Sequence, residues 1–320
     1  MAKEIRSIAA VYFDRFNHRE LELNCPVPSN LELIVVIPSH NEPDLLGSLR
    51  SLKDAFVPIG VSVEVITVIN HGVNTDSDIV EQNEKTVVQA NQFSLKNNCE
   101  PITFKTLEVF DMPPKKAGVG LARKIGMDEA LNRFSKINKD GIIVCFDADS
   151  LCESTYFEAI LSHFKKHPKT PGCSIHFEHP LEGNNHTIEE YNAIILYELH
   201  LRYYKNAQRY TGLPFVFHTI GSSMAVRASA YAKQGGMNKR KAGEDFYFLN
   251  KIIQLGNFTE LNATTVIPSP RISDRVPFGT GKAVSEIVSA DVKSLETYNF
   301  RIFVELKAFV LEVLKNNKEI

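Results

Sequence analysis

A short apolar run that ends in two acidic residues constrains the fold more than any other part of this sequence. Residues 142–146 are Ile, Ile, Val, Cys and Phe, and Asp147, Ala148 and Asp149 follow directly. A continuous apolar run of this length is typical of a strand buried on both faces of a parallel sheet. Open α/β sheets bind ligands at the carboxyl ends of their strands. The sequence therefore predicts an α/β protein with Asp147 and Asp149 at a ligand-binding edge.

The two carboxylates of this motif predict a metal site. Two unit charges about 4 Å apart repel each other by about 4 kcal/mol at an effective dielectric constant near 20. A divalent cation, Mn²⁺ or Mg²⁺, bound by Asp147 and Asp149 would remove this cost and leave charge to hold a phosphate. The motif alone leaves a second interpretation open, in which one of these residues is the N-cap of a helix that starts after Ser154.

The overall composition excludes several classes of protein. The chain has 320 residues, 43% of them hydrophobic, and a net charge of −2, so it can bury a large core but offers no general basic field for nucleic acid. No apolar run approaches the ~20 residues that span a bilayer, and residues 1–10 lack a signal-peptide core. The five scattered cysteines lack C-x-x-C spacing, which indicates a reduced, cytoplasmic protein.

Two further apolar segments predict strands that precede Asp147 in the same sheet. Residues 31–37 form the first and residues 64–70 the second, and each is followed by a polar turn and a helical pattern. A repeated strand, turn and helix opens a doubly wound α/β fold, so the turns should lie at the edge that carries Asp147. The first turn includes Ser39, Asn41 and Glu42, and the second strand ends at Asn70. A simple helix start, capped by Ser39 or Asn41, is the alternative for the first turn.

A basic segment with small residues opens the helix before the acidic strand. Gly118 and Gly120 would let backbone approach a ligand, and helix N-terminal amides favour anions. Arg123 follows them and could hold a diphosphate, whereas a solvated basic face is the alternative.

A second acidic pair, Glu244 and Asp245, begins a helical pattern later in the chain. Aspartate has an ordinary pKa near 3.9 and is ionised at neutral pH, so Asp245 could act as a general base. Favourable interaction of both carboxylates with the helix macrodipole is the alternative. Beyond this helix, residues 268–282 form a loop in which Arg271 and Arg275 could close over a diphosphate or an acidic acceptor.

Taken in order, five of these segments resemble family 2 of the glycosyltransferases with the GT-A fold, over about residues 31–267. The resemblance implies an α/β fold with a mostly parallel central sheet and a nucleoside-diphosphate sugar as donor. It implies an inverting transfer in which Asp245, beside Glu244, is the base and a divalent cation lies on Asp149 and Asp147. The donor-binding residues implied by the matching motifs are Pro38, Ser39, Asn41, Glu42, Asn70, Arg123, Asp147, Gly221 and Ser222.

The chain departs from the family pattern at three places. Asn70 and His71 stand where the family usually has two aspartates, Lys124 stands in place of an asparagine, and no histidine follows His218. The first change leaves the base of the donor open, and the last leaves the third metal ligand open, with Asp274 as a substitute. These departures leave a catalytically silent nucleotide-sugar-binding protein as one alternative function. A nucleotidyltransferase on a related sheet is a second alternative, although residues 38–42 lack the Gly-rich, Arg-containing loop that such an enzyme would need. A retaining mechanism also stays possible.

The sequence suggests a central domain with two extensions. We expect an N-terminal helical extension over residues 1–30, a GT-A domain over residues 31–282 and a helical tail over residues 283–320. The GT-A domain should divide near residue 150 into a nucleotide-binding half and an acceptor-binding half. The tail is expected to pack on the core, with dimerisation and contact with a membrane surface as alternatives. The acceptor (a glycan, a lipid-linked sugar or a small molecule) is not indicated. A zinc site at His176, His179 and His186 is less favoured than a wet sheet face.

Overall fold

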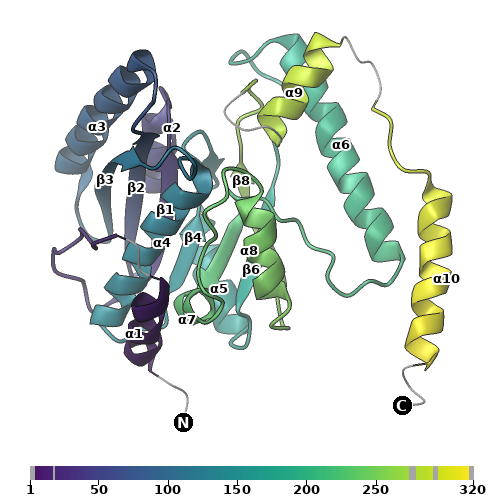
Figure 1. The fold of residues 1–320 in the computed structure, drawn as a ribbon, viewed down its shortest axis with the longest axis horizontal. Helices are drawn as coiled ribbons and strands as arrows, with labels where there is room; N and C mark the ends of the chain where they lie inside the picture. Colours follow the sequence, from purple (N-terminus) through teal and green to yellow (C-terminus); the bar gives the residue numbers. More distant parts are fainter. Residues whose placement is uncertain (1–3, 17–18, 274–278, 291–294, 317–320) are drawn as a thin grey trace. The chain divides into compact units, whose positions relative to one another are not determined.

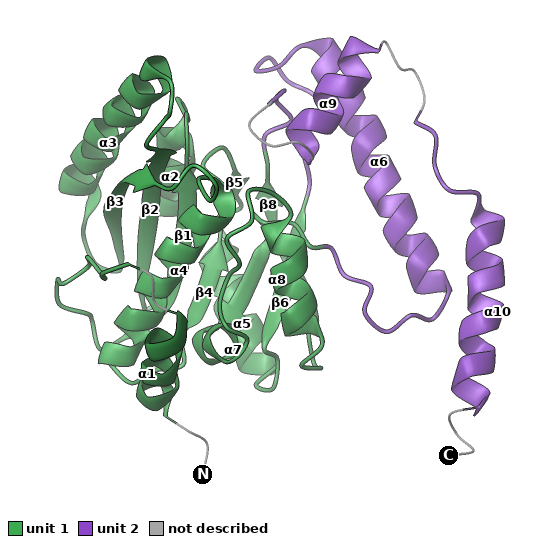
Figure 2. Ribbon diagram, viewed as in Figure 1, with its two compact units in different colours: residues 1–177, 219–268 green, residues 178–218, 269–320 purple. Residues whose placement is uncertain are grey.

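The computed structural model describes residues 4–16, 19–273, 279–290 and 295–316. Contacts divide the chain into two units (Figure 2). Unit 1 comprises residues 1–177 and 219–268, and unit 2 comprises residues 178–218 and 269–320. The domain boundaries expected near residues 30, 150 and 282 stay predictions.

Unit 1 contains an eight-stranded sheet with the order β3-β2-β1-β4-β7-β6-β8-β5 (Figure 1). Parallel ladders join β3, β2, β1 and β4, and another joins β6 to β8, whereas β7 runs antiparallel to β4 and β6. The expected mostly parallel α/β fold is confirmed. The strands are β1 (Leu31–Ser39), β2 (Ser62–Gly72), β3 (Ile102–Met112), β4 (Ile142–Cys145), β5 (Leu151–Cys152), β6 (Gly172–Phe177), β7 (Met224–Arg227) and β8 (Thr259–Ile267).

Helices flank this sheet, and one of them lies unusually close to it. The helices of unit 1 are α1 (Ile5–Phe16), α2 (Leu45–Asp54), α3 (Ser77–Asn97), α4 (Val119–Lys136), α5 (Tyr156–Lys166), α7 (Ala228–Lys233) and α8 (Glu244–Ile253). Helix α4 packs over β1 and β2 at Gly126, where an added Cβ would come within 2.4 Å of Val36 Cγ1. Glycine is therefore needed for this close approach.

The N-terminal helix is attached to the sheet unit by a buried polar cluster. Tyr12 of α1 donates a hydrogen bond to Asp128 Oδ1 (2.6 Å), and Tyr231 of α7 donates to the same oxygen (2.6 Å). Lys124 Nζ lies 2.9 Å from Asp128 Oδ2 and is 3% exposed in its side chain. Lys124 is therefore buried in the cluster that attaches α1 to the sheet unit.

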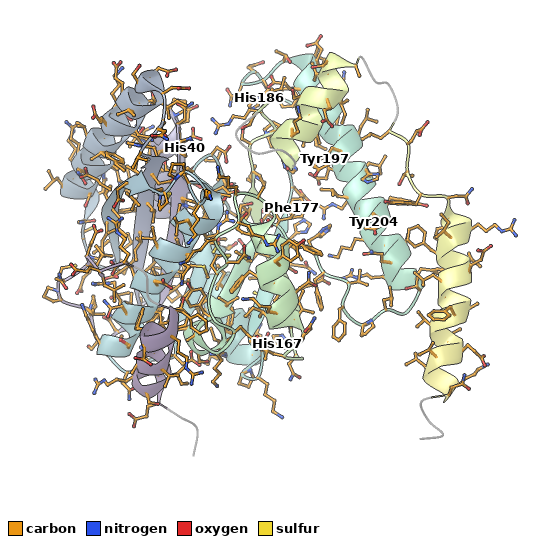
Figure 3. All side chains as sticks on the ribbon, in the orientation of Figure 1. His40, His167, Phe177, His186, Tyr197 and Tyr204 are labelled. Carbon is orange, nitrogen blue, oxygen red and sulfur yellow. The ribbon has the colours of Figure 1, made fainter. Side chains whose placement is uncertain are left out.

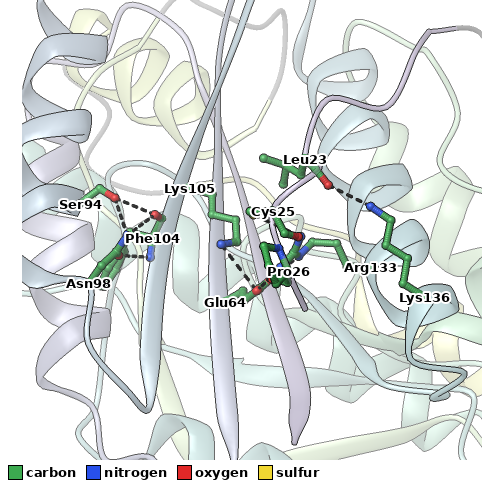
Figure 4. A network of polar contacts seen from close by, with 10 residues as sticks. All are labelled: Leu23, Cys25, Pro26, Glu64, Ser94, Asn98, Phe104, Lys105, Arg133 and Lys136. Carbon is green, nitrogen blue, oxygen red and sulfur yellow. Dashed lines mark hydrogen bonds and ion pairs between the residues drawn. The ribbon is translucent and has the colours of Figure 1, made fainter. Parts of the chain in front are cut away.

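A second buried network ties the segment after α1 to the sheet (Figure 4). Arg133 of α4 pairs with both carboxylate oxygens of Glu64 on β2, and it also donates to the carbonyl oxygens of Cys25 (3.2 Å) and Pro26 (3.1 Å). Lys105 Nζ of β3 lies 3.7 Å from Glu64. Because a buried carboxylate is tolerated only when it is paired, these cations explain why Glu64 can lie inside the sheet.

Unit 2 consists of α6 (Ile188–Tyr210), α9 (Thr280–Ser289) and α10 (Phe300–Asn316) with their connecting segments. Helix α6 begins with a capping box between Thr187 and Glu190. Val284 and Ile287 of α9 pack against Ala193 and Ile194 of α6, which forms a small core. In the parts of the chain that the structure describes, no helix is both long and apolar enough to cross a bilayer.

Candidate active site

The turns that end β1 and β2 are joined by Asn83 of α3, a residue that the sequence analysis did not single out. The Asn83 side chain accepts a hydrogen bond from the Asn41 backbone N–H (2.9 Å) and donates one to the Asn70 carbonyl oxygen (3.1 Å). Asn41 has a φ of 49°, a left-handed conformation that asparagine tolerates better than most residues. A lone asparagine within a polar helical pattern carries no signal for such a role.

Two side chains of the first turn, Ser39 and Glu42, are buried. Ser39 and Glu42 are each 1% exposed, and Glu42 accepts a hydrogen bond from the Asp44 N–H (3.0 Å). The ring nitrogen Nδ1 of His40 lies 2.8 Å from the Asn70 carbonyl oxygen, at the end of β1 (Figure 3). Among the described residues the Ser39 hydroxyl has no hydrogen-bond partner. Pro38 lies within β1, one residue before the strand ends at Ser39.

Asn70 and His71, which replace the two aspartates usual in the family, lie together at the end of β2. The Asn70 amide donates to the carbonyl oxygens of Ser39 (2.9 Å) and Val68 (3.2 Å), so only its oxygen is left to accept from a ligand. His71 stacks on Phe110 of β3 with a centroid distance of 4.3 Å. Its Nε2 is buried and lacks a hydrogen-bond partner within the described part of the chain.

Arg123 of α4 joins the two acidic motifs. Its Nη2 donates to Asp147 Oδ1 (2.7 Å) after β4, and its Nη1 donates to Glu244 Oε1 at the start of α8. Arg123 is 2% exposed. Gly221 packs on the guanidinium, because an added Cβ would lie 2.6 Å from Nη1. The structure thus brings Asp147 and Glu244 to one side of the sheet, and the sequence did not reveal that Arg123 connects them.

Asp245 lies beside this cluster. Its Oδ1 accepts a hydrogen bond from the Phe246 N–H (2.7 Å), and the Gly221 backbone also bonds to the carboxylate. Ser222 is 1% exposed and lies within hydrogen-bonding distance of the Ser223 hydroxyl (3.5 Å). The segment between residues 219 and 245 therefore places Gly221 and Asp245 near Arg123, and Ser222 follows Gly221 directly.

Negative charge exceeds positive charge at this cluster. Asp147, Glu244 and Asp245 all interact electrostatically with the single guanidinium of Arg123. Burial raises the pKa of Glu244 from 4.5 to about 7, and Asp245 and Asp147 add to the shift while Arg123 opposes it. Burial also raises the pKa of Asp245. Carboxylates in this environment are stabilised by any cation that approaches them.

Asp147 and Asp149, the expected metal ligands, are both half-buried in the turn after β4. Ser48 of α2 donates to the carbonyl oxygens of Ala148 (2.8 Å) and Ser150 (2.7 Å), which fixes the turn. The N-cap of α5 is Thr155, so the interpretation of Asp147 or Asp149 as that N-cap is wrong. The described residues contain no group of three or more His, Cys, Asp and Glu side chains that could hold a metal ion alone.

Three further expected residues, Arg271, Asp274 and Arg275, follow β8 in the sequence. Arg271 belongs to unit 2, where its backbone N–H lies 3.3 Å from the Ser269 hydroxyl. Arg275 and Asp274 lie outside the described residues. His179, one of the three histidines considered for zinc, bonds through Nδ1 to Glu198 Oε2 (2.7 Å). No metal-ligand group of that kind occurs among the described residues.

The raised pKa of Glu244 predicts a pH-dependent stability. The group ionises near 4.5 when unfolded and near 7 when folded, so the folded state binds the proton more tightly. The stability that it contributes is complete below pH 4.5 and is lost as the pH rises to about 7. The free energy of unfolding is therefore compared between the native protein and Glu244→Gln. The difference, native minus variant, should fall as the pH rises from 4.5 to about 7, by at most about 1.4 kcal/mol per pH unit. Urea unfolding at several pH values measures it, and a constant or rising difference contradicts the assignment.

A comparison with models of protein families matches more than half of the chain to one family. The family described as glycosyl transferase family 2 matches residues 34–235. No curated protein matches the sequence. Residues 1–349 of S. aureus TarS, solved with UDP-GlcNAc, are 13% identical with a TM-score of 0.50, covering 88% of this chain and 71% of TarS 1–349. This similarity concerns the fold.

Two further solved structures are similar at lower scores. The mannosyltransferase PcManGT from Pyrobaculum calidifontis, in complex with GDP-Man and Mn²⁺, is 14% identical with a TM-score of 0.44, and the match covers 82% of this chain and 68% of that one. Glucosyl-3-phosphoglycerate synthase from Mycobacterium tuberculosis, with Mn²⁺, UDP and phosphoglyceric acid, is 13% identical with a TM-score of 0.41, over 73% and 69% of the two chains.

Proposed function

Since the chain belongs to the family 2 glycosyltransferases, we propose that it transfers a sugar, with inversion, from a nucleoside-diphosphate donor to an acceptor hydroxyl with the help of a divalent cation. The observation that carries this proposal is the Arg123 bridge. The Arg123 guanidinium pairs with Asp147 of the first acidic motif and with Glu244 of the second, and Asp245 lies beside them. A leaving-group site and a base must be this close for one transfer to use both.

The nucleoside is proposed to bind where β1 and β2 end. Glu42 could accept hydrogen bonds from two vicinal ribose hydroxyls, and the Asn70 oxygen could accept from a base N–H. Pro38, Ser39 and Asn41 supply the backbone of this turn, which Asn83 holds in place. Arg123 is proposed to act on the donor through Asp147.

The residues present fit a divalent cation, Mn²⁺ or Mg²⁺. Asp147 uses one carboxylate oxygen for Arg123, and its other oxygen together with the Asp149 carboxylate would hold the cation. Such ions are commonly bound through one or two carboxylates together with substrate phosphates, so a site without a third protein ligand is reasonable. When bound, the cation supplies positive charge for the departing diphosphate.

Asp245 is proposed to be the base. The acceptor O–H bond breaks as its proton moves to the Asp245 carboxylate, and the acceptor oxygen forms a bond to the anomeric carbon. The bond from that carbon to the diphosphate breaks on the opposite face, which inverts the configuration. Gly221 and Ser222 are proposed to border the sugar, because the backbone of Gly221 contacts the Asp245 carboxylate.

Donor hydrolysis tests this function. We expect the protein to release nucleoside diphosphate from a nucleotide sugar in the presence of Mn²⁺, and we expect a chelator to abolish the release and fresh Mn²⁺ to restore it. A screen of uridine and guanosine diphosphate sugars identifies the donor. Binding of a donor without any turnover, with every acceptor class tried, would instead favour a silent nucleotide-sugar-binding protein.

A further inference from the structure

The first turn of α4 packs closely against the loop that leads into α8. An added Cβ at Gly120 would lie 2.2 Å from the Arg240 carbonyl oxygen and 3.0 Å from Glu244 Cβ. An added Cβ at Gly118 would lie 3.1 Å from the Cα atom of Lys241. Because neither glycine has a side chain, the loop can lie directly beside the acidic pair that begins α8.

This junction gathers positive charge from two segments that are far apart in the sequence. Lys115 and Lys116 are exposed in the turn before α4. Arg240 and Lys241 are exposed in the loop before α8. Burial lowers the pKa of Lys239, and nearby positive charges, that of Lys116 among them, add to the shift, so the two segments act on each other. We call Lys115, Lys116, Lys239, Arg240 and Lys241 the basic cluster.

The basic cluster lacks counter-charges within the protein. In the described part of the chain, none of its five side chains forms an ion pair with a carboxylate. Glu244, which lies beside the loop, already pairs with Arg123. Arg240 instead contacts an aromatic ring, because its guanidinium carbon lies 3.8 Å from the centroid of Tyr247. Cations gathered without counter-charges repel one another, so an anion that binds among them is stabilised.

The position of the basic cluster indicates which anion it meets. Arg240 lies over Tyr247, two residues beyond Asp245 on α8, so an acceptor hydroxyl at Asp245 brings the rest of the acceptor close to the cluster. The donor diphosphate is instead proposed to bind the cation held by Asp147 and Asp149. A phosphate monoester carries nearly two charges and three acceptor oxygens. It therefore matches several cations at once, whereas a single carboxylate leaves most of them unmatched.

We propose that the basic cluster binds a phosphate group on the acceptor, which makes a phosphorylated sugar or polyol the class of acceptor. Arg240 and Lys241 meet the phosphate from the loop before α8, and Lys115 and Lys116 meet it from the turn before α4. The reacting hydroxyl of the same molecule reaches Asp245. The identity of this molecule as an acceptor rests on the proposed function, whereas its binding to the basic cluster needs no turnover.

Calorimetric titration of glycerol 3-phosphate and glucose 6-phosphate tests the proposal, with glycerol and glucose as uncharged probes. We expect at least one phosphorylated compound to bind, its uncharged counterpart not to bind, and high salt to weaken the binding. R240Q/K241Q should weaken the affinity about tenfold, because charged hydrogen bonds to the phosphate are lost. K115Q/K116Q should weaken it in the same direction. Absence of binding by both phosphorylated compounds contradicts the proposal.

The matched control is K165Q/K166Q, which removes two exposed lysines from the last turn of α5 in the same unit. Its affinity for the phosphorylated compound should change by less than about twofold, since exposed cations away from the site contribute little. The thermal midpoint of each variant shows whether it is folded. A loss in the control equal to that in R240Q/K241Q, or native affinity in both cluster variants, overturns the proposal.

A second set of titrations separates the acceptor from other sources of phosphate. With excess UDP or GDP and Mg²⁺ present, the phosphorylated compound should bind as it does alone. Competition by either nucleotide would assign the basic cluster to the donor diphosphate and overturn the proposal. Sedimentation with phosphatidylserine vesicles, or tighter binding to a single-stranded oligonucleotide, that R240Q/K241Q abolishes would overturn it as well. Phosphate binding that persists without any donor hydrolysis would overturn the proposed function while the phosphate site stands.

Discussion

Replacing Asp245 with Asn is expected to reduce the rate of sugar transfer by about 10²–10⁴-fold while the donor still binds. The amide keeps the shape of the side chain and an oxygen that can accept from the Phe246 N–H, so the start of α8 should be preserved. It cannot take a proton from the acceptor hydroxyl. Rates under donor saturation, together with donor affinity by calorimetry, separate the two effects.

The matched control for this variant is Asp111→Asn. Asp111 is an exposed carboxylate of β3 that pairs with Arg19 at the surface, and its replacement should change the transfer rate by less than twofold. A rate in Asp245→Asn within tenfold of the native rate would remove Asp245 from the role of base. A loss of donor affinity that accounts for the whole effect would make it a binding residue instead.

Replacing Arg123 with Met is expected to destabilise the protein by about 3–5 kcal/mol, because it leaves the buried Glu244 carboxylate without its partner. Arg123 and Glu244 have side chains that are 2% and 4% exposed, so water cannot take the place of the guanidinium. Chemical denaturation measures the change. The double variant R123M/E244Q should recover at least about 1 kcal/mol of it, since Glu244, the carboxylate that Arg123 pairs with in the interior, then carries no charge.

Arg19→Met is the matched control for this prediction. Arg19 also forms two ion pairs, with Glu22 and Asp111, but at the surface, where an ion pair typically contributes less than about 1 kcal/mol. Similar losses of stability in Arg19→Met and Arg123→Met would show that Arg123 does not compensate the buried charge of Glu244. Additive effects of R123M and E244Q would show the same.

The features of the fold that sequence could predict are those set by local patterns. The apolar run before Asp147 and the runs before Glu42 and Asn70 identified buried parallel strands, because a strand covered on both faces has no polar alternation. The two-residue strand β5 was missed because so short a segment has no pattern of its own.

The features that sequence could not predict depend on contacts between distant segments. Arg123 was expected to face a diphosphate, and only the packing of α4 against β4 and α8 reveals that its guanidinium meets Asp147 and Glu244. Lys124, its neighbour, is buried and pairs with Asp128, which also accepts a hydrogen bond from Tyr12 of α1. The role of Asn83 was missed for the same reason, because its partners Asn41 and Asn70 come from two other segments.

The central claim is that Asp147 and Asp149 bind a divalent cation that holds the donor diphosphate next to Asp245. It is tested most directly by calorimetric titration of the identified nucleotide sugar into the native protein and into Asp149→Asn, each with Mn²⁺ and with a chelator. We predict that the native protein binds the donor at least about tenfold more tightly with Mn²⁺ than with the chelator, and that Asp149→Asn loses this difference. Equal donor affinity in all four titrations would contradict the claim.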